Sequence, residues 1–85
     1  METKYLELIV EAHAGVDLDQ LRFRLQHENV ETLPMQSGLL ISGDISALRA
    51  VIPNVTGNEP GEVAVPTYLN DVVKTIYVVK PRWLT

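Results

Sequence analysis

Hydrophobic and polar residues alternate along the first dozen positions of the chain. In KYLELIVEA, residues 4–12, every second residue points to the same face of an extended strand. One face carries Leu6, Leu8 and Val10, and the other carries Tyr5, Glu7, Ile9 and Glu11. The pattern therefore predicts a first strand with one buried face and one mostly solvated face.

A helical period replaces this alternation in residues 18–28. Three leucines recur at the spacing of one helix face: Leu18, Leu21 and Leu25. Asp17, with Gln20 three residues later, is typical of a capping box. We therefore expect a helix that begins at about Leu18 and ends near Asn29, a residue that tolerates left-handed backbone.

The middle of the chain reads as two strands and a second helix. Residues 30–36 fit an irregular edge strand, because Pro34 lacks the N–H donor that a central strand needs. Residues 37–44 form a short apolar run between glycines, typical of a buried strand. Asp44 can cap a helix over residues 45–52, which must end before Pro53.

The last third carries weaker signals. Residues 53–62 are rich in turn-forming residues, residues 62–66 fit a short edge strand, and residues 67–74 fit a helical turn or two capped by Thr67. Residues 75–80 are rich in β-formers and predict a strand that Pro81 ends. We assign residues 53–71 to a loop-rich insertion and residues 81–85 to a C-terminal tail.

This order of elements predicts the fold class. Strand, helix, strand, strand, helix and final strand is the βαββαβ pattern of ferredoxin-like α+β two-layer sandwiches, here with the insertion before the last strand. A chain of 85 residues is one domain of this kind. We expect a core of Leu6, Leu8, Val10, Leu18, Leu21, Leu25, Leu40, Leu48, Ile52, Ile76 and Val78.

Composition and charge narrow the classes of function. The chain has no cysteine, so disulfides, thiol nucleophiles and cysteine zinc sites are excluded. All eleven acids but only four cations lie in residues 1–73, which disfavours a nucleic-acid partner. The N-terminal segment is too acidic for a signal peptide and no apolar run is long enough to span a membrane, so we expect a cytoplasmic protein without a membrane partner.

Groups that could carry chemistry are sparse. Glu11 and His13 share a strand face near Asp17, yet they lack a third metal ligand and a nucleophile. His27 falls near the end of the predicted helix, where a structural role is expected. We therefore expect no catalytic residue, no metal and no cofactor, and a protein that is not an enzyme.

Three stretches carry a family resemblance: GVDLDQLRFRLQHENVE, LPMQSGLLISGDISALRAVI and IYVVKPRW. Together they resemble the inhibitor and propeptide family of subtilisin-like serine proteases. The resemblance implies a ferredoxin-like fold whose sheet face docks on a protease and whose extended C-terminal tail enters the active-site cleft. Two features depart from the family pattern: the insertion after the second helix, and Lys80 at a position that is acidic in the family.

These observations predict a small protein-binding module. Its partner is expected to be a protease or, in an alternative reading, a second copy of the chain or another protein with no protease involved. In the second reading the sheet face forms a homodimer or an adaptor contact, and Trp83 is an interface anchor or folds back on the core. The predicted partner-binding residues are Tyr5, Ile9, Tyr77, Val79, Lys80, Pro81, Arg82 and Trp83.

Overall fold

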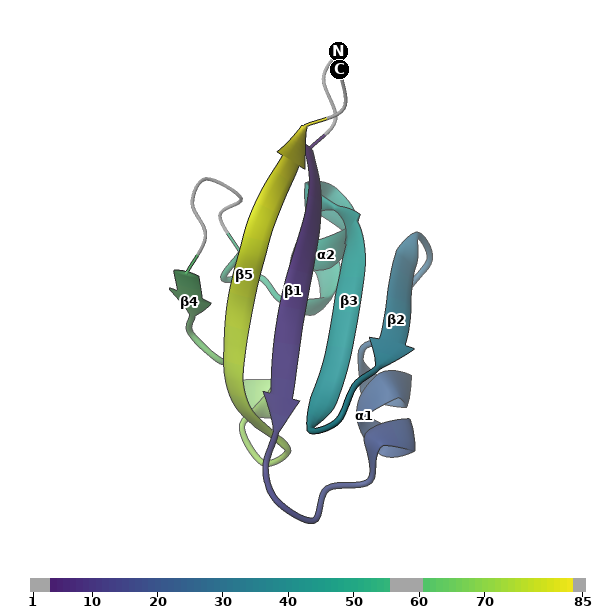
Figure 1. The fold of residues 1–85 in the computed structure, drawn as a ribbon, viewed down its shortest axis with the longest axis vertical. Coiled ribbons are helices and arrows are strands. Elements are labelled where there is room, and N and C mark those ends of the chain that lie inside the picture. Colours follow the sequence, from purple (N-terminus) through teal and green to yellow (C-terminus); the bar gives the residue numbers. More distant parts are fainter. Residues whose placement is uncertain (1–3, 56–60, 84–85) are drawn as a thin grey trace.

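The computed structural model describes the backbone of residues 4–55 and 61–83, and the side chains of residues 6–55 and 61–79. Within these residues the chain forms five strands, two α-helices and one 3-10 turn (Figure 1). In chain order they are β1 (Lys4–Ala12), α1 (Leu18–Arg24), β2 (Val30–Pro34), β3 (Gly38–Asp44), α2 (Ile45–Val51), β4 (Gly61–Val63), η1 (Thr67–Leu69) and β5 (Val73–Trp83).

The strands form one antiparallel sheet in the order β2-β3-β1-β5-β4. The first and last strands of the chain are therefore neighbours in the middle of the sheet (Figure 1). Their register pairs Leu8 with Val78 and Val10 with Ile76, so the apolar residues of both strands share one face. The protein belongs to the α+β class.

Both helices contribute to one hydrophobic core on that face. Figure 1 shows α2 behind β1 and β3, and Leu21 and Leu25 of α1 are fully buried in the same core as Leu48 of α2. The opposite face of the sheet has no helix over it in the described part of the chain. Hereafter we call this side the open face.

The predicted core is confirmed at nine of its eleven positions, and β3 accounts for one of the differences. Leu39 and Ile41 are the buried residues of this strand, whereas Leu40 is only partly buried and lies on the open face. Pairing with β1 decides which residues of β3 face the core, because Ile41 lies opposite the buried Leu8. The prediction of Leu40 in the core is therefore wrong by one residue, and Leu18 packs at the rim of the core rather than inside it.

The first helix begins where the sequence predicts and ends earlier. The Asp17 side chain accepts a hydrogen bond from the Asp19 backbone N–H at 2.9 Å, which caps the helix. The helix ends at Arg24 with Leu25 as C-cap, not at Asn29. Asn29 does adopt left-handed backbone, with φ of 71°, but in the turn that leads into β2. Asp44 is the N-cap of α2, yet its side chain makes no capping bond there.

The last third contains more pairing than its loop-like composition predicts. β4 is the short edge strand that we expected, η1 is a single 3-10 turn with Pro66 as N-cap, and Thr67 is the first residue of that turn. β5 does not end before Pro81; it continues to Trp83, three residues into the predicted tail. Because β4 pairs only as far as Val78, a proline beyond that point is compatible with the strand.

Candidate functional site

The open face carries a continuous row of apolar side chains that crosses four strands. Directly opposite residues of antiparallel strands point to the same face, so the register defines the row. Leu33 lies opposite Leu40, Leu40 opposite Ile9, and Ile9 opposite Tyr77. We call these four residues, Leu33, Leu40, Ile9 and Tyr77, the apolar row.

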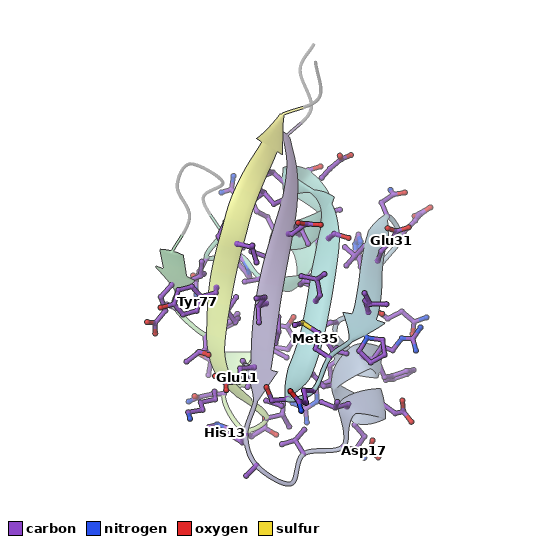
Figure 2. The ribbon with its side chains drawn as sticks, in the orientation of Figure 1. Glu11, His13, Asp17, Glu31, Met35 and Tyr77 are labelled. Atoms are coloured by element: carbon purple, nitrogen blue, oxygen red, sulfur yellow. The ribbon has the colours of Figure 1, made fainter. Side chains whose placement is uncertain are left out.

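The row is accessible at both ends. The exposed fraction is 59% for Leu33 and 49% for Tyr77, while Ile9 and Leu40 between them are partly buried. Tyr77 stands on β5 in Figure 2, next to the short strand β4. A half-exposed aromatic ring beside three aliphatic side chains is typical of a protein contact surface.

Acidic residues border the apolar row. Glu62 follows Tyr77 across β4, and Glu11 lies two residues from Ile9 along β1. The Glu11 carboxylate accepts a hydrogen bond from Thr75 Oγ1 at 2.9 Å, which fixes its orientation on the face. Glu7 and Glu31 lie opposite Ser42 from either side. Four carboxylates, those of Glu7, Glu11, Glu31 and Glu62, therefore border the apolar row.

A break in register places a further predicted residue beside this surface. Glu7 pairs with Lys80 and Leu8 pairs with Val78, so Val79 is the extra residue of a β-bulge. Its exposed fraction is 42%. Of the predicted partner-binding residues, the structure thus brings Ile9, Tyr77 and Val79 into one region of the sheet.

The other predicted partner-binding residues are described by their backbone alone. Tyr5, Lys80, Pro81, Arg82 and Trp83 belong to β1 and β5, but their side chains lie outside the described part. Their backbone pairing is regular, with Lys4 opposite Trp83 and Tyr5 opposite Arg82. Residues 84 and 85 of the predicted tail lie outside the described residues altogether.

The groups considered for catalysis each have a separate partner. His13 Nε2 lies 3.3 Å from the Asn70 carbonyl oxygen, Asp17 caps α1, and Glu11 is held by Thr75. Figure 2 shows that their side chains do not converge on one point. His27 Nδ1 lies 2.7 Å from the backbone oxygen of Glu28, beyond the helix end. In residues 4–55 and 61–83, no three His, Cys, Asp or Glu side chains gather as a metal site.

A polar cluster connects α1 to the η1 turn. Arg24 Nη1 and Nη2 donate to the two Asp71 carboxylate oxygens at 2.9 and 3.1 Å, and Nη1 also donates to the Tyr68 carbonyl at 3.1 Å. This fork lowers the pKa of Asp71 and raises that of Arg24, chiefly through the side-chain hydrogen bonds. Burial raises the pKa of Tyr68, whose hydroxyl donates to the Val51 carbonyl. These contacts join α1 and the end of α2 to the segment between β4 and β5.

Sequence reasoning missed two members of the apolar row, Leu33 and Leu40. Leu33 lies on a segment that Pro34 marked as irregular, and Leu40 was assigned to the core. Leu33 lies two residues after Glu31, so both side chains point to the same face of an extended strand. The charged Glu31 is the signal that could have placed Leu33 on the solvated face.

Comparisons of the chain with protein-family models, characterised proteins and solved structures give no match. No helix within the described residues combines the length and apolar character needed to cross a membrane. Function is therefore inferred from the fold and the apolar row.

Proposed function

We propose that this chain is a non-enzymatic protein-binding module that docks a partner protein on its open face. The observation that carries the proposal is the apolar row, four side chains in register across four strands with a half-exposed tyrosine at one end. Covering such a band removes apolar area from water, and an aromatic residue is the usual anchor of a contact of this kind. The exposed Glu62 opposite Tyr77 favours a partner with a cation at that end of the row.

We further propose that the fold is ferredoxin-like. Four strands in the order β2-β3-β1-β5, with α1 after β1 and α2 after β3, support this topology. β4 then belongs to the insertion and adds an edge strand beside β5. In this arrangement one face of the sheet carries the helices and the other is left for binding.

Photo-crosslinking inside the producing cell tests the docking surface. A photoreactive phenylalanine analogue replaces Tyr77 on the open face, and the same analogue replaces Ala50, an exposed position on α2, as the control. The proposal expects a discrete crosslinked protein from position 77 and none from position 50. Equal crosslinking at both positions, or none at position 77, would contradict it.

A protease inhibitor is the second candidate function. The family resemblance favours it, and β5 extends to Trp83, beyond Val78, the last residue that pairs with β4. Titration of a subtilisin-like protease with the purified chain tests this candidate. Stoichiometric inhibition supports it, and full protease activity at a large excess of the chain excludes it. A crosslink from position 77 to a second copy would instead assign the surface to self-association.

A further inference from the structure

The outer edge of β2 exposes backbone hydrogen-bonding groups. Of the described strands only β3 pairs with β2. The Met35 N–H donates to the Gly38 carbonyl at 2.8 Å, and hydrogen-bonded pairs alternate along an antiparallel ladder, so Leu33 and Glu31 point their backbone groups toward β3. The N–H and C=O of Thr32 consequently point outward.

Val30 and Pro34 also point their backbone groups outward on this edge, but neither has a free N–H donor. Pro34 has no N–H, which is why a proline fits here without removing a bond to β3. The Val30 N–H already donates to the His27 carbonyl at 3.1 Å. The outward groups are therefore three acceptors, the carbonyls of Val30, Thr32 and Pro34, and one donor, the N–H of Thr32.

A hollow of about 860 Å³ runs along this edge and reaches both faces of β2. Its walls include Phe23 of α1 and Leu33 of β2, with exposed fractions of 77% and 59%. These are the two most exposed large apolar side chains in the described part of the chain. Figure 1 shows α1 beside β2 at the end where the strand finishes. Backbone groups and apolar walls thus meet in one place.

We propose that the edge of β2 binds an extended segment of another protein as an added antiparallel strand. Side chains of an added strand alternate between the two faces, and the hollow extends to both faces. The Thr32 hydroxyl accepts from Arg22 Nε at 2.9 Å, so this side chain faces α1. The segment residue opposite Thr32 therefore points toward the Phe23 side, and the residue opposite Leu33 points toward the open face.

The backbone inventory favours another protein over a second copy of the chain. In a two-fold β2–β2 pair centred on Thr32, Val30 lies opposite the proline of the other copy, which has no donor for the Val30 carbonyl. Only the two bonds between the threonines form. A segment with N–H groups opposite Val30, Thr32 and Pro34 donates to all three carbonyls and accepts from Thr32, which makes four bonds. The bound segment therefore has residues other than proline opposite Val30, Thr32 and Pro34. Its residue opposite Leu33 is apolar.

This site goes beyond the docking function proposed for the open face. Leu33 and Leu40 border both surfaces, but the outward backbone groups of β2 belong to the edge alone. A variant that changes those groups therefore tests the edge without changing Ile9 or Tyr77.

Thr32→Pro is the decisive variant, and Thr32→Val is its matched control. Proline removes the outward N–H and fills the edge, whereas valine keeps the N–H and the β-branched shape. The probe is a synthetic octapeptide chosen from a random phage-displayed library by binding to the full chain. We expect Thr32→Pro to weaken peptide binding about tenfold or more and Thr32→Val to change it less than about twofold. The peptide should also slow hydrogen exchange of the Thr32 amide.

A second measurement decides the question if Thr32→Pro does not fold. Single N-methyl groups placed along the peptide backbone should abolish binding at alternate positions, those that donate to β2, and be tolerated between them. The proposal is overturned if no peptide is selected, if N-methylation shows no alternation, or if a folded Thr32→Pro binds as well as the wild type. A dimer of the free chain that Thr32→Pro dissociates would assign the edge to a second copy and also overturn it. Crosslinking at position 77 reports on the open face separately, so the two proposals can fail independently.

Discussion

At the scale of single residues, the adjacent Leu39 and Leu40 have opposite roles. Leu39 is fully buried under the helices, and Leu40 is partly buried on the open face. We expect Leu39→Ala to lower the free energy of unfolding by about 2–5 kcal/mol, because it leaves a cavity in the core. Leu40→Ala should cost about 1 kcal/mol or less. Urea denaturation of both variants measures the difference, and equal losses would contradict the strand parity.

The parity of β3 could not be read from the sequence. GLLIS offers three consecutive apolar residues, so alternation alone does not say which of them face the core. The pairing of Ile41 with Leu8 decides it, and this is a contact between distant parts of the chain. β1 shows the contrasting case, because its polar residues alternate regularly and Leu6, Leu8 and Val10 were placed correctly.

Tyr68 stabilises the fold through its hydroxyl group, which donates to the Val51 carbonyl at the end of α2. Tyr68→Phe should lower the free energy of unfolding by about 1 kcal/mol at pH 7. Burial raises the folded-state pKa of Tyr68 above its ordinary value of 10.0. The contribution is therefore complete below about pH 10 and is lost as the pH rises through the raised pKa.

Thermal unfolding of wild type and Tyr68→Phe at pH 7 and pH 11.5 checks this dependence. The difference in Tm should narrow at the higher pH. A difference that stays constant, or one that widens, would show that the hydroxyl bond is not the cause.

At the scale of elements, the Arg24–Asp71 fork holds the turn before β5 against α1. The hydrogen bonds from Arg24 lower the pKa of Asp71 below its ordinary value of 3.8. The ion pair accordingly contributes stability above about pH 4, and the contribution is lost as the pH falls through the lowered pKa. We expect Asp71→Asn to lower Tm at pH 7, and the difference in Tm from the wild type to shrink as the pH falls below about 4.

Two observations separate the fork from a general charge effect. Arg24→Lys keeps the charge but not the two-pronged geometry, so it should lose part of the stability that Asp71→Asn loses. Amide exchange in residues 69–72 should accelerate in both variants, because this is the turn that the fork holds. Unchanged exchange there would mean that the fork does not anchor the turn.

Elements with strong local sequence signals are predicted well. Element ends that depend on contacts with distant parts of the chain are not. β1, the start of α1 and both β2 and β3 follow from alternation, capping and turn residues. The early end of α1 was missed because Leu25 is apolar and continues the helical stripe as a C-cap. The extension of β5 through Pro81 is missed because the sequence does not show that β5 continues to pair with β1 while its pairing with β4 ends at Val78.

At the scale of the whole molecule, the end of β5 completes the central pair of strands. Deleting residues 81–85 removes the backbone partners of Lys4, Tyr5 and Leu6. We expect Tm to fall by about 4–8 °C for each kcal/mol of lost pairing. A chain that ends at Trp83 is the control, since it retains every described pair. A tail that is free of the sheet predicts no change in Tm, and that result would contradict the pairing.

The same pair of strands has a consequence for how the chain folds during synthesis. Of the five strands, β1 is made before its neighbour β5, which is the last of them, so one backbone edge of β1 lacks its partner strand until residue 83 has been made. Pairing residues 8 and 78 also requires closure of nearly the whole chain, and such contacts slow folding. A circular permutant that links the two ends and opens the chain at Gly15 would make β5 and β1 consecutive. Stopped-flow refolding should show that the permutant folds faster than the natural order of strands.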